Sequence, residues 1–247
     1  MVEYKYYIIS MLAIVLCGLL CGLASAKVSK AYSKYGRMGT RSRMTGYDTA
    51  RRLLVSNGVK DISIGRVRGS LTDHYHPTKK IVNLSESVYG NTSVAAVAVA
   101  AHEIGHVMQK KKGYFFYNIR TALVPITNFG SRLAMPLVLI GLLLDISVQH
   151  TNDYTLGYVL AMSGVVLYGL STLFALVTLP VELDASRRAK KMLIKEGIIT
   201  EEELPYADKM LDAAAMTYVA SLLTSIVYFL RFLLWVLIMF GGRRRND

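Results

Sequence analysis

The chain has 247 residues, 53% of them hydrophobic, and a formal net charge of +12. A mean hydropathy of +0.35 argues against a soluble domain, and the long apolar runs assign the excess Lys and Arg to the flanks of membrane segments rather than to a nucleic-acid surface. The two cysteines, Cys17 and Cys21, lie in the first apolar run, which excludes a disulfide framework outside the membrane and a cysteine-rich zinc cluster.

The first apolar run extends from Tyr6 to Ala26, and a helix needs about 20 apolar residues to cross a bilayer. Its end, "ASA", also fits the cleavage site of a signal peptide. However, basic residues dominate the following stretch, with no acidic residue before Asp48. Positive charge on this flank favours a retained anchor over residues 1–26, followed by a cytoplasmic segment.

Three further apolar runs cover residues 133–148, 156–179 and 216–240. The first of these is short for a span, but a polar connection without Lys or Arg ties it to the next run, which predicts a transmembrane hairpin over residues 131–180. The last run contains Arg231 and precedes three arginines. It is either a full span that violates the charge rule or a pair of re-entrant or interfacial helices broken near Arg231.

The polar chain between the first two runs predicts a helix, a small sheet and a second helix. Residues 45–57 have helical periodicity and stop before Gly58. "ISIGRV" and "KIVNLS" are typical of strands, and "DHYHPT" between them of a turn. A long helix is expected from an N-cap at Thr92 or Ser93 to a stop at Gly113.

The long helix carries "AAHEIGHVMQ", in which His102 and His106 are four residues apart. Residues at this spacing share one face of an α-helix, so two imidazoles can reach one zinc ion. Glu103 can then act as a general base on a water molecule. With this composition, the His-Glu-x-x-His pattern is expected by chance about 0.003 times, which favours a zinc site over an ordinary amphipathic helix.

A catalytic zinc ion also needs a third protein ligand. His150 is excluded because it falls on the outer loop of the hairpin, whereas His74 and His76 in the predicted turn remain alternatives. Glu182, in "PVELDASRRA" after the third apolar run, is the favoured ligand. Its other interpretation is a helix cap or an ion pair with one of the following arginines.

Three stretches, "LTDHYHPTKKIVNLSESVY", "SVAAVAVAAHEIGHVMQ" and "PVELDASRRA", together resemble the YugP-type neutral zinc metallopeptidases of bacterial membranes. The resemblance covers nearly the whole chain. More distantly, the layout is similar to the HtpX and CAAX-prenyl-protease group, which also places a transmembrane hairpin between the His-Glu motif and a glutamate ligand. Together these resemblances imply a mainly α-helical integral membrane protein with about four membrane-associated helices and a cytoplasmic, zincin-like α+β part with a small sheet.

By this resemblance, His102 and His106 bind zinc, Glu103 is the catalytic base and Glu182 is the third ligand. Ser186 stands where the distant group has an aspartate that orients the first histidine. We therefore expect Asp184 or Ser186 to supply the hydrogen bond that fixes an imidazole.

Other site residues are weaker expectations. A cation or hydroxyl usually stabilises the oxyanion, and Arg187, Arg188 and Tyr206 are the candidates, although the arginines also fit the charge rule for membrane flanks. The strand with Val82, Asn83 and Leu84 is either a docking strand for an extended substrate or a plain structural strand.

The chain is thus expected to divide into five segments: an anchor (1–26), a zincin-like cytoplasmic part (27–130), a transmembrane hairpin (131–180), a cytoplasmic helical part with the third ligand (181–215), and a membrane segment with a basic tail (216–247). The predicted function is a multi-pass metalloendopeptidase of the cell membrane. It would hold one Zn²⁺ on the cytoplasmic side and cleave membrane or membrane-proximal proteins.

The expected partners are a protein or peptide substrate, the lipid bilayer, and a membrane-protein partner or a second copy, but no nucleic acid. The alternative is a zinc-binding membrane scaffold or chaperone-like partner without proteolysis. Glu103 argues against it, because a structural zinc site needs no base. A transporter is disfavoured, since Asp145 and Arg231 are the only ionisable residues in the predicted spans.

Overall fold

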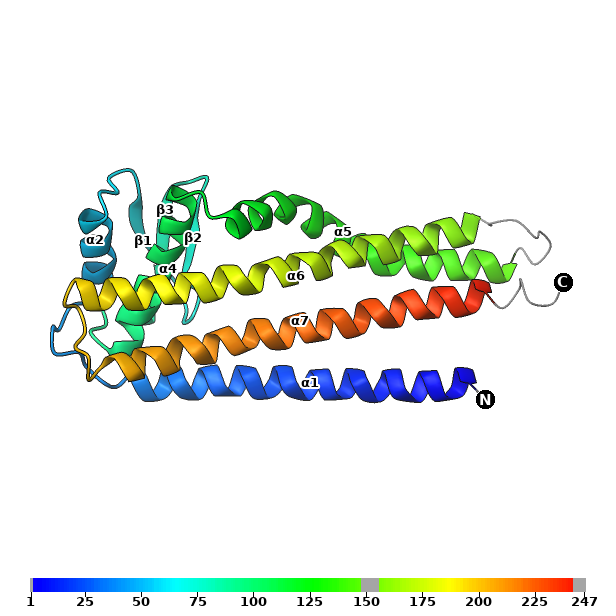
Figure 1. The fold of residues 1–247 in the computed structure, drawn as a ribbon, viewed down its shortest axis with the longest axis horizontal. Helices are drawn as coiled ribbons and strands as arrows, with labels where there is room; N and C mark the ends of the chain where they lie inside the picture. Colours follow the sequence, from blue (N-terminus) through cyan, green and yellow to red (C-terminus); the bar gives the residue numbers. More distant parts are fainter. Residues whose placement is uncertain (1, 148–155, 242–247) are drawn as a thin grey trace. The chain divides into compact units, whose positions relative to one another are not determined.

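The computed structural model describes residues 2–147 and 156–241 and is mainly helical (Figure 1). The helices are α1 (Val2–Tyr35), α2 (Gly46–Ser56), α3 (Glu86–Tyr89), α4 (Val94–Lys111), α5 (Phe115–Ser147), α6 (Leu156–Lys195) and α7 (Leu204–Gly241), and the strands are β1 (Ser63–Val67), β2 (His74–His76) and β3 (Ile81–Ser85). The chain divides into two compact units. We call residues 1–21, 119–178 and 219–247 the helical unit and residues 22–118 and 179–218 the sheet unit.

Four helices of the described chain are long and apolar enough to cross a membrane, namely α1, α5, α6 and α7. The expectation of about four membrane-associated helices is therefore confirmed by length and composition. Helix α5 begins at Phe115, well before the apolar run at residue 133, and continues through Pro125 and Pro136. The second candidate span is thus longer than the predicted apolar run, because that run counted only the part of the helix beyond Arg132.

Helix α7 continues without interruption through Arg231. A pair of helices broken at this residue is therefore wrong. Arg231 contacts α1 within the helical unit, where its Nη1 donates to Met11 Sδ at 3.5 Å and its carbonyl accepts from Tyr6 Oη at 2.7 Å. The loop with His150 and the arginines of the tail lie outside the described residues.

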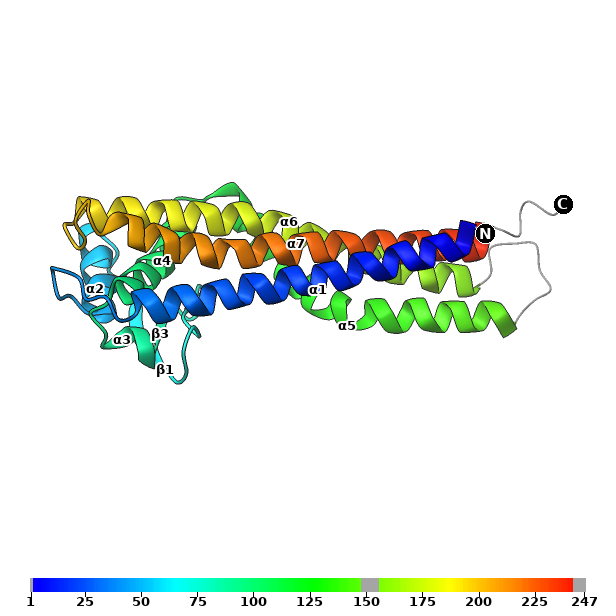
Figure 2. The same ribbon diagram turned by 90° about the horizontal axis from the view of Figure 1, so that it is seen from below.

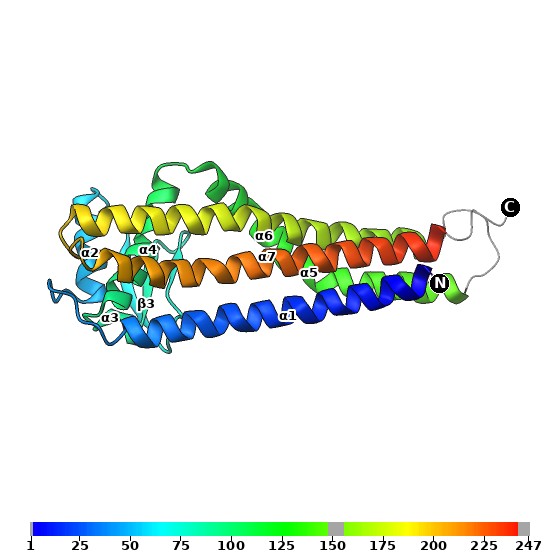
Figure 3. The same ribbon diagram turned by 60° about the horizontal axis from the view of Figure 1, so that its bottom comes forward.

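Small residues allow close helix packing in the helical unit. A Cβ on Gly141 of α5 would lie 2.5 Å from the backbone nitrogen of Ala161 on α6, and one on Gly164 of α6 would lie 2.5 Å from the carbonyl oxygen of Ala134. Such contacts let helix backbones approach where the lipid offers no hydrophobic driving force. Helices α6 and α7 lie side by side in this unit (Figure 3), and Thr172 Oγ1 lies 3.1 Å from Ser225 Oγ.

The sheet unit contains a three-stranded sheet of order β1-β3-β2. Figure 2 shows β1 and β3 next to α3. Strand β3 is parallel to β1 and antiparallel to β2. The segment predicted as a turn, residues 73–78, thus contains β2, the second edge strand. Strand β3 is central, with Val82 and Leu84 fully buried. Val82 and Asn83 pair with β1 on one side and with β2 on the other, so the prediction that they dock a substrate by strand addition is wrong. Leu84 pairs with β1 and its side chain is part of the core.

Helix α4 forms the centre of the sheet unit. Ser93 is its N-cap, with Oγ accepting from the Ala96 N–H at 3.2 Å, and Gly113 follows its end with a φ of +61°. Its first turns are Ala- and Val-rich and almost entirely buried. Helix α2 begins with a capping box between Thr45 and Asp48, which the sequence analysis did not single out.

Candidate metal centre

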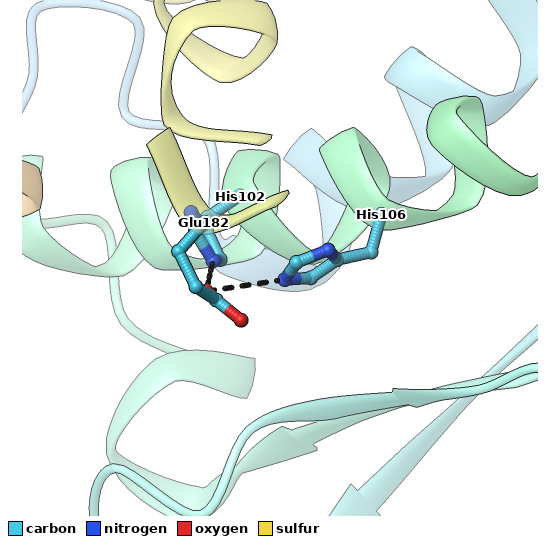
Figure 4. Close-up of side chains that lie close together, drawn as sticks. All are labelled: His102, His106 and Glu182. Carbon is cyan, nitrogen blue, oxygen red and sulfur yellow. Dashed lines mark hydrogen bonds and ion pairs between the residues drawn. The ribbon is translucent and has the colours of Figure 1, made fainter. Parts of the chain in front are cut away.

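Helices α4 and α6 bring together three ligand-type side chains from distant parts of the sequence. Glu182 Oε2 of α6 lies 3.2 Å from His102 Nε2 and 3.5 Å from His106 Nε2 of α4 (Figure 4). One ligand atom of each residue lies within 4.8 Å of the others. Glu182 is only 2% exposed and His106 only 8%. We refer to these three residues as the cluster.

Gly105 makes this approach of the two helices possible. A Cβ built on Gly105 would lie 2.5 Å from the carbonyl oxygen of Ala185, a separation that real Cβ atoms do not show. Only the absence of a side chain at this position allows α6 to lie against α4 at the level of the cluster. The glycine of the His-Glu motif therefore has a structural reason for its presence.

Gln109, one turn after His106, fixes the imidazole of His106. The amide nitrogen of Gln109 donates to the Val181 carbonyl at 2.7 Å and to Asp184 Oδ2 at 3.0 Å, so its oxygen is the atom that faces His106 Nδ1 at 2.9 Å. An amide oxygen only accepts hydrogen bonds. His106 therefore carries its proton on Nδ1, and the Nε2 lone pair points to the cluster.

Ser186 occupies the corresponding position beside the other histidine. Its Oγ lies 3.1 Å from His102 Nδ1, so that Nε2 is again the nitrogen that faces Glu182. Of the two residues expected to orient an imidazole, Ser186 contacts His102 directly. Asp184 acts on His106 through Gln109, which the sequence analysis did not identify.

Glu103 is buried next to the cluster, with 7% exposure, and no described residue forms a hydrogen bond or ion pair with its carboxylate. Burial raises the pKa of Glu103 to about 7. The nearby His102 lowers this pKa, and the negative charge of Glu182 raises it further. Buried carboxyl groups are normally paired. An unpaired one with a pKa near neutrality suits a group that accepts and returns a proton.

The start of β2 lies near Glu103, since Asp73 and His74 both act on the pKa of Glu103. Asp73 accepts from the Ser85 N–H at 2.7 Å and from Ser85 Oγ at 2.8 Å, which ties β2 to the end of β3. His74 is held by the Thr72 carbonyl at Nδ1 and by Asn83 at Nε2. Of the candidates for the third ligand, Glu182 lies with the two histidines of α4, and His74 and His76 do not.

The predicted oxyanion residues have other contacts. Arg187 and Arg188 both pair with Asp184, and the guanidinium of Arg188 also lies over the ring of Tyr114. Tyr206 stacks on Tyr35 with ring centroids 5.9 Å apart. A tyrosine that the sequence analysis did not single out, Tyr117, lies beside the cluster, with its ring centroid 6.3 Å from that of His106.

The cluster fits a zinc ion by its donor set and by its tautomer. Two imidazole nitrogens and one carboxylate oxygen are the ligands of several catalytic zinc sites. The contacts of both Nδ1 atoms leave both Nε2 atoms for the cluster, as is usual for metal-bound histidines. Burying such polar groups without a metal would be costly.

A His-Glu-x-x-His helix and a distant glutamate, in a chain with four helices apolar enough to cross a membrane, are typical of membrane-associated zinc peptidases. The chain belongs to the family described as "Putative neutral zinc metallopeptidase", whose model matches residues 7–237. A curated relative, "Putative membrane protease YugP" of Bacillus subtilis (strain 168), is 41% identical over 223 residues, which cover 90% of this chain and 93% of the relative. No solved structure matches the chain.

Proposed function

We propose that the protein is a membrane-bound zinc metalloendopeptidase that hydrolyses peptide bonds of membrane or membrane-proximal proteins. The observation that carries this proposal is the buried, unpaired carboxylate of Glu103 beside the cluster of His102, His106 and Glu182. A purely structural zinc site has no use for such a group. The family and the curated relative support the same activity.

When bound, one Zn²⁺ would polarise the scissile carbonyl and lower the pKa of a water molecule towards neutrality. His102, His106 and Glu182 would hold the ion, while Ser186 and Gln109 keep both imidazoles in the required orientation. The Glu103 carboxylate takes the proton of the attacking water. It then delivers this proton to the leaving amine, so that it ends the cycle ionised as it began.

The open edge of β2 offers a docking position for the substrate. Strand β2 pairs with β3 on one side only and is an edge of the sheet. Its first residues, Asp73 and His74, lie close enough to Glu103 to affect its pKa. An extended substrate that adds to β2 through main-chain hydrogen bonds would therefore lie beside the catalytic base. This replaces the central strand β3 as the docking strand.

We further propose that the sheet unit lies on the cytoplasmic side, because the segment from residue 27 onward is strongly basic. The zincin-like part (27–130) and the helical part with the third ligand (181–215) would then act together on this side. The anchor (1–26), the hairpin (131–180) and the C-terminal segment (216–247) would hold the protein in the bilayer.

The test is the variant Glu103→Gln, with Glu201→Gln as a control that also removes one carboxylate from the sheet unit. We expect Glu103→Gln to keep one zinc ion per chain by metal analysis and to lose activity on a membrane-protein substrate by more than about 100-fold. Glu201→Gln should change neither property. Equal cleavage by wild type and Glu103→Gln would remove Glu103 from the mechanism. Zinc retention without cleavage by the wild type would favour the scaffold function instead.

A further inference from the structure

A cavity lies next to the residues that support the cluster. It has a volume of about 310 Å³ and lies between the end of α2, the end of α4 and the C-terminal part of α6. Asn57, Met108 and Met192 form its neutral walls. Ligand cavities in proteins start at about this size, and a volume of this order accommodates one oxyanion with a small organic group.

The cavity is strongly cationic. Four basic side chains line it, and Asp184 is its single carboxylate; the basic residues are Lys112, Arg187, Arg188 and Lys191. Asp184 already pairs with both arginines and accepts from Gln109. Throughout residues 2–147 and 156–241, no side chain forms an ion pair with either lysine. The cavity therefore has unbalanced positive charge.

The fixed position of a guanidinium group in the cavity favours an anion whose charge is carried by oxygen atoms. Asp184 and the ring of Tyr114 hold the guanidinium of Arg188 in place, so little conformational entropy is lost when this group forms further hydrogen bonds. A planar guanidinium forms paired hydrogen bonds with phosphate or carboxylate oxygens, and lysine ammonium groups add charge-assisted bonds from the side.

We propose that this cavity binds a small oxyanion, specifically a phosphate group. The cavity is lined by none of the three zinc ligands and by no residue of β2, the proposed docking strand for the substrate. Two hydrogen bonds connect it to the metal centre, since Asp184 accepts from Gln109 and Gln109 accepts from His106. An anion that competes with Asp184 for the arginines would therefore act on the orientation of a zinc ligand.

The phosphate can come from two sources, a free phosphorylated metabolite or an anionic lipid headgroup. The cavity residues of α6 follow the apolar run 156–179 on the same helix by 5 to 13 residues. At 1.5 Å per residue this corresponds to roughly 8–20 Å along the axis, so the nearer residues are within reach of a headgroup. Both sources share the chemistry of the phosphate group.

The experiment measures the binding of inorganic phosphate to the metal-free, full-length protein in a maltoside detergent at fixed ionic strength, by calorimetry or ³¹P NMR. Metal-free protein is used because zinc itself would bind phosphate. The test variant is Lys112→Gln/Lys191→Gln. The matched control, Lys110→Gln/Lys195→Gln, removes the same charge from the ends of the same two helices but outside the cavity.

We expect saturable binding at one site by the wild type, a loss of affinity of about tenfold or more in Lys112→Gln/Lys191→Gln, and less than a twofold change in the control. The variant Lys112→Arg/Lys191→Arg should retain binding, which separates loss of charge from misfolding. An equal loss in both glutamine variants would assign the effect to overall charge and overturn the proposal. So would the absence of saturable binding to the wild type at millimolar phosphate.

Nanodiscs then distinguish the two sources. If headgroups occupy the cavity, phosphate should bind the wild type more weakly in discs that contain phosphatidylglycerol than in discs of phosphatidylcholine alone. Equal affinity in both discs would identify a free phosphorylated compound as the ligand. Either result keeps the assignment of the cavity as a phosphate-binding site and decides only the source of the phosphate.

Discussion

The carbonyl oxygen of Ala185 lies where a side chain on Gly105 would have to be. Its distance to a Cβ built on Gly105 is 2.5 Å, and the carbonyl carbon and Cα of Ala185 follow at 3.1 Å. Because these are backbone atoms, a rotamer change cannot relieve the contact. The spacing between α4 and α6 at the metal centre therefore depends on this glycine.

Replacing Gly105 with alanine should separate the helices. We expect Gly105→Ala to destabilise the protein by about 1–3 kcal/mol, as overpacking does, and to weaken zinc binding because Glu182 moves away from the imidazoles. Thermal unfolding and zinc content are the measurements. The control is Gly90→Ala, since a Cβ at Gly90 meets nothing within 4 Å; similar losses in both variants would contradict the packing argument.

Removing the amide of Gln109 should affect zinc without touching a ligand. Gln109→Leu leaves His106 Nδ1 without its acceptor and Asp184 without one donor. Loss of such supporting bonds typically costs 10–100-fold in metal affinity, and we expect that range in a competition titration with a chelator. Lys110→Leu changes the exposed neighbour and should leave the affinity as it is. Unaltered affinity in Gln109→Leu would mean that His106 is oriented by packing alone.

The ion pairs of Asp61 should make stability depend on pH. Hydrogen bonds from Lys111 and then Lys80 lower the pKa of Asp61 to about 2, from 3.8. A lowered carboxyl pKa means that its stabilisation is fully present above 3.8 and is lost as the pH falls towards about 2. Asp61→Asn should therefore unfold at a lower temperature than the wild type at neutral pH, and the difference should shrink below pH 3.8. A difference that stays constant with pH would rule out this origin.

The packing of α5 against α6 should depend on Gly164. A Cβ on this residue would lie 2.5 Å from the Ala134 carbonyl and 2.7 Å from a methyl group of Val138. We expect Gly164→Val to lower the thermal midpoint in detergent and to increase proteolysis of the hairpin. Gly18→Val is the comparison, because a Cβ at Gly18 on α1 has open space. Equal stability of the two variants would contradict close packing between α5 and α6.

Elements with strong local signals could be predicted from the sequence. The helical period of α2 and the histidine spacing of α4 are properties of neighbouring residues, and both helices appear where expected. Helix α5 was placed too late because Asn118, Arg120 and Arg132 interrupt the apolar pattern although the backbone stays helical. Strand β2 was missed because its three residues are too few to show an alternation.

The supporting residues of the metal centre depend on tertiary contacts and could not be predicted in the same way. Gln109 is one polar residue near a helix end, and only the nearby Asp184 and His106 define its role. Gly105 did carry a signal, since glycine inside a helix usually has a packing reason. Glu182 could be predicted only as a ligand-type residue in the right region, because helix periodicity does not relate positions on opposite sides of a hairpin.

The order of the zinc donors along the chain has a consequence for biogenesis. Glu182 follows His102 by 80 residues, and both predicted membrane crossings of the hairpin lie between them. A growing polypeptide that has emerged only through α4 holds two of the three donors and would capture the ion weakly. Glu182 reaches the same side of the membrane as the two histidines only after an even number of crossings. Tight binding of the metal would therefore indicate that the hairpin has been inserted correctly.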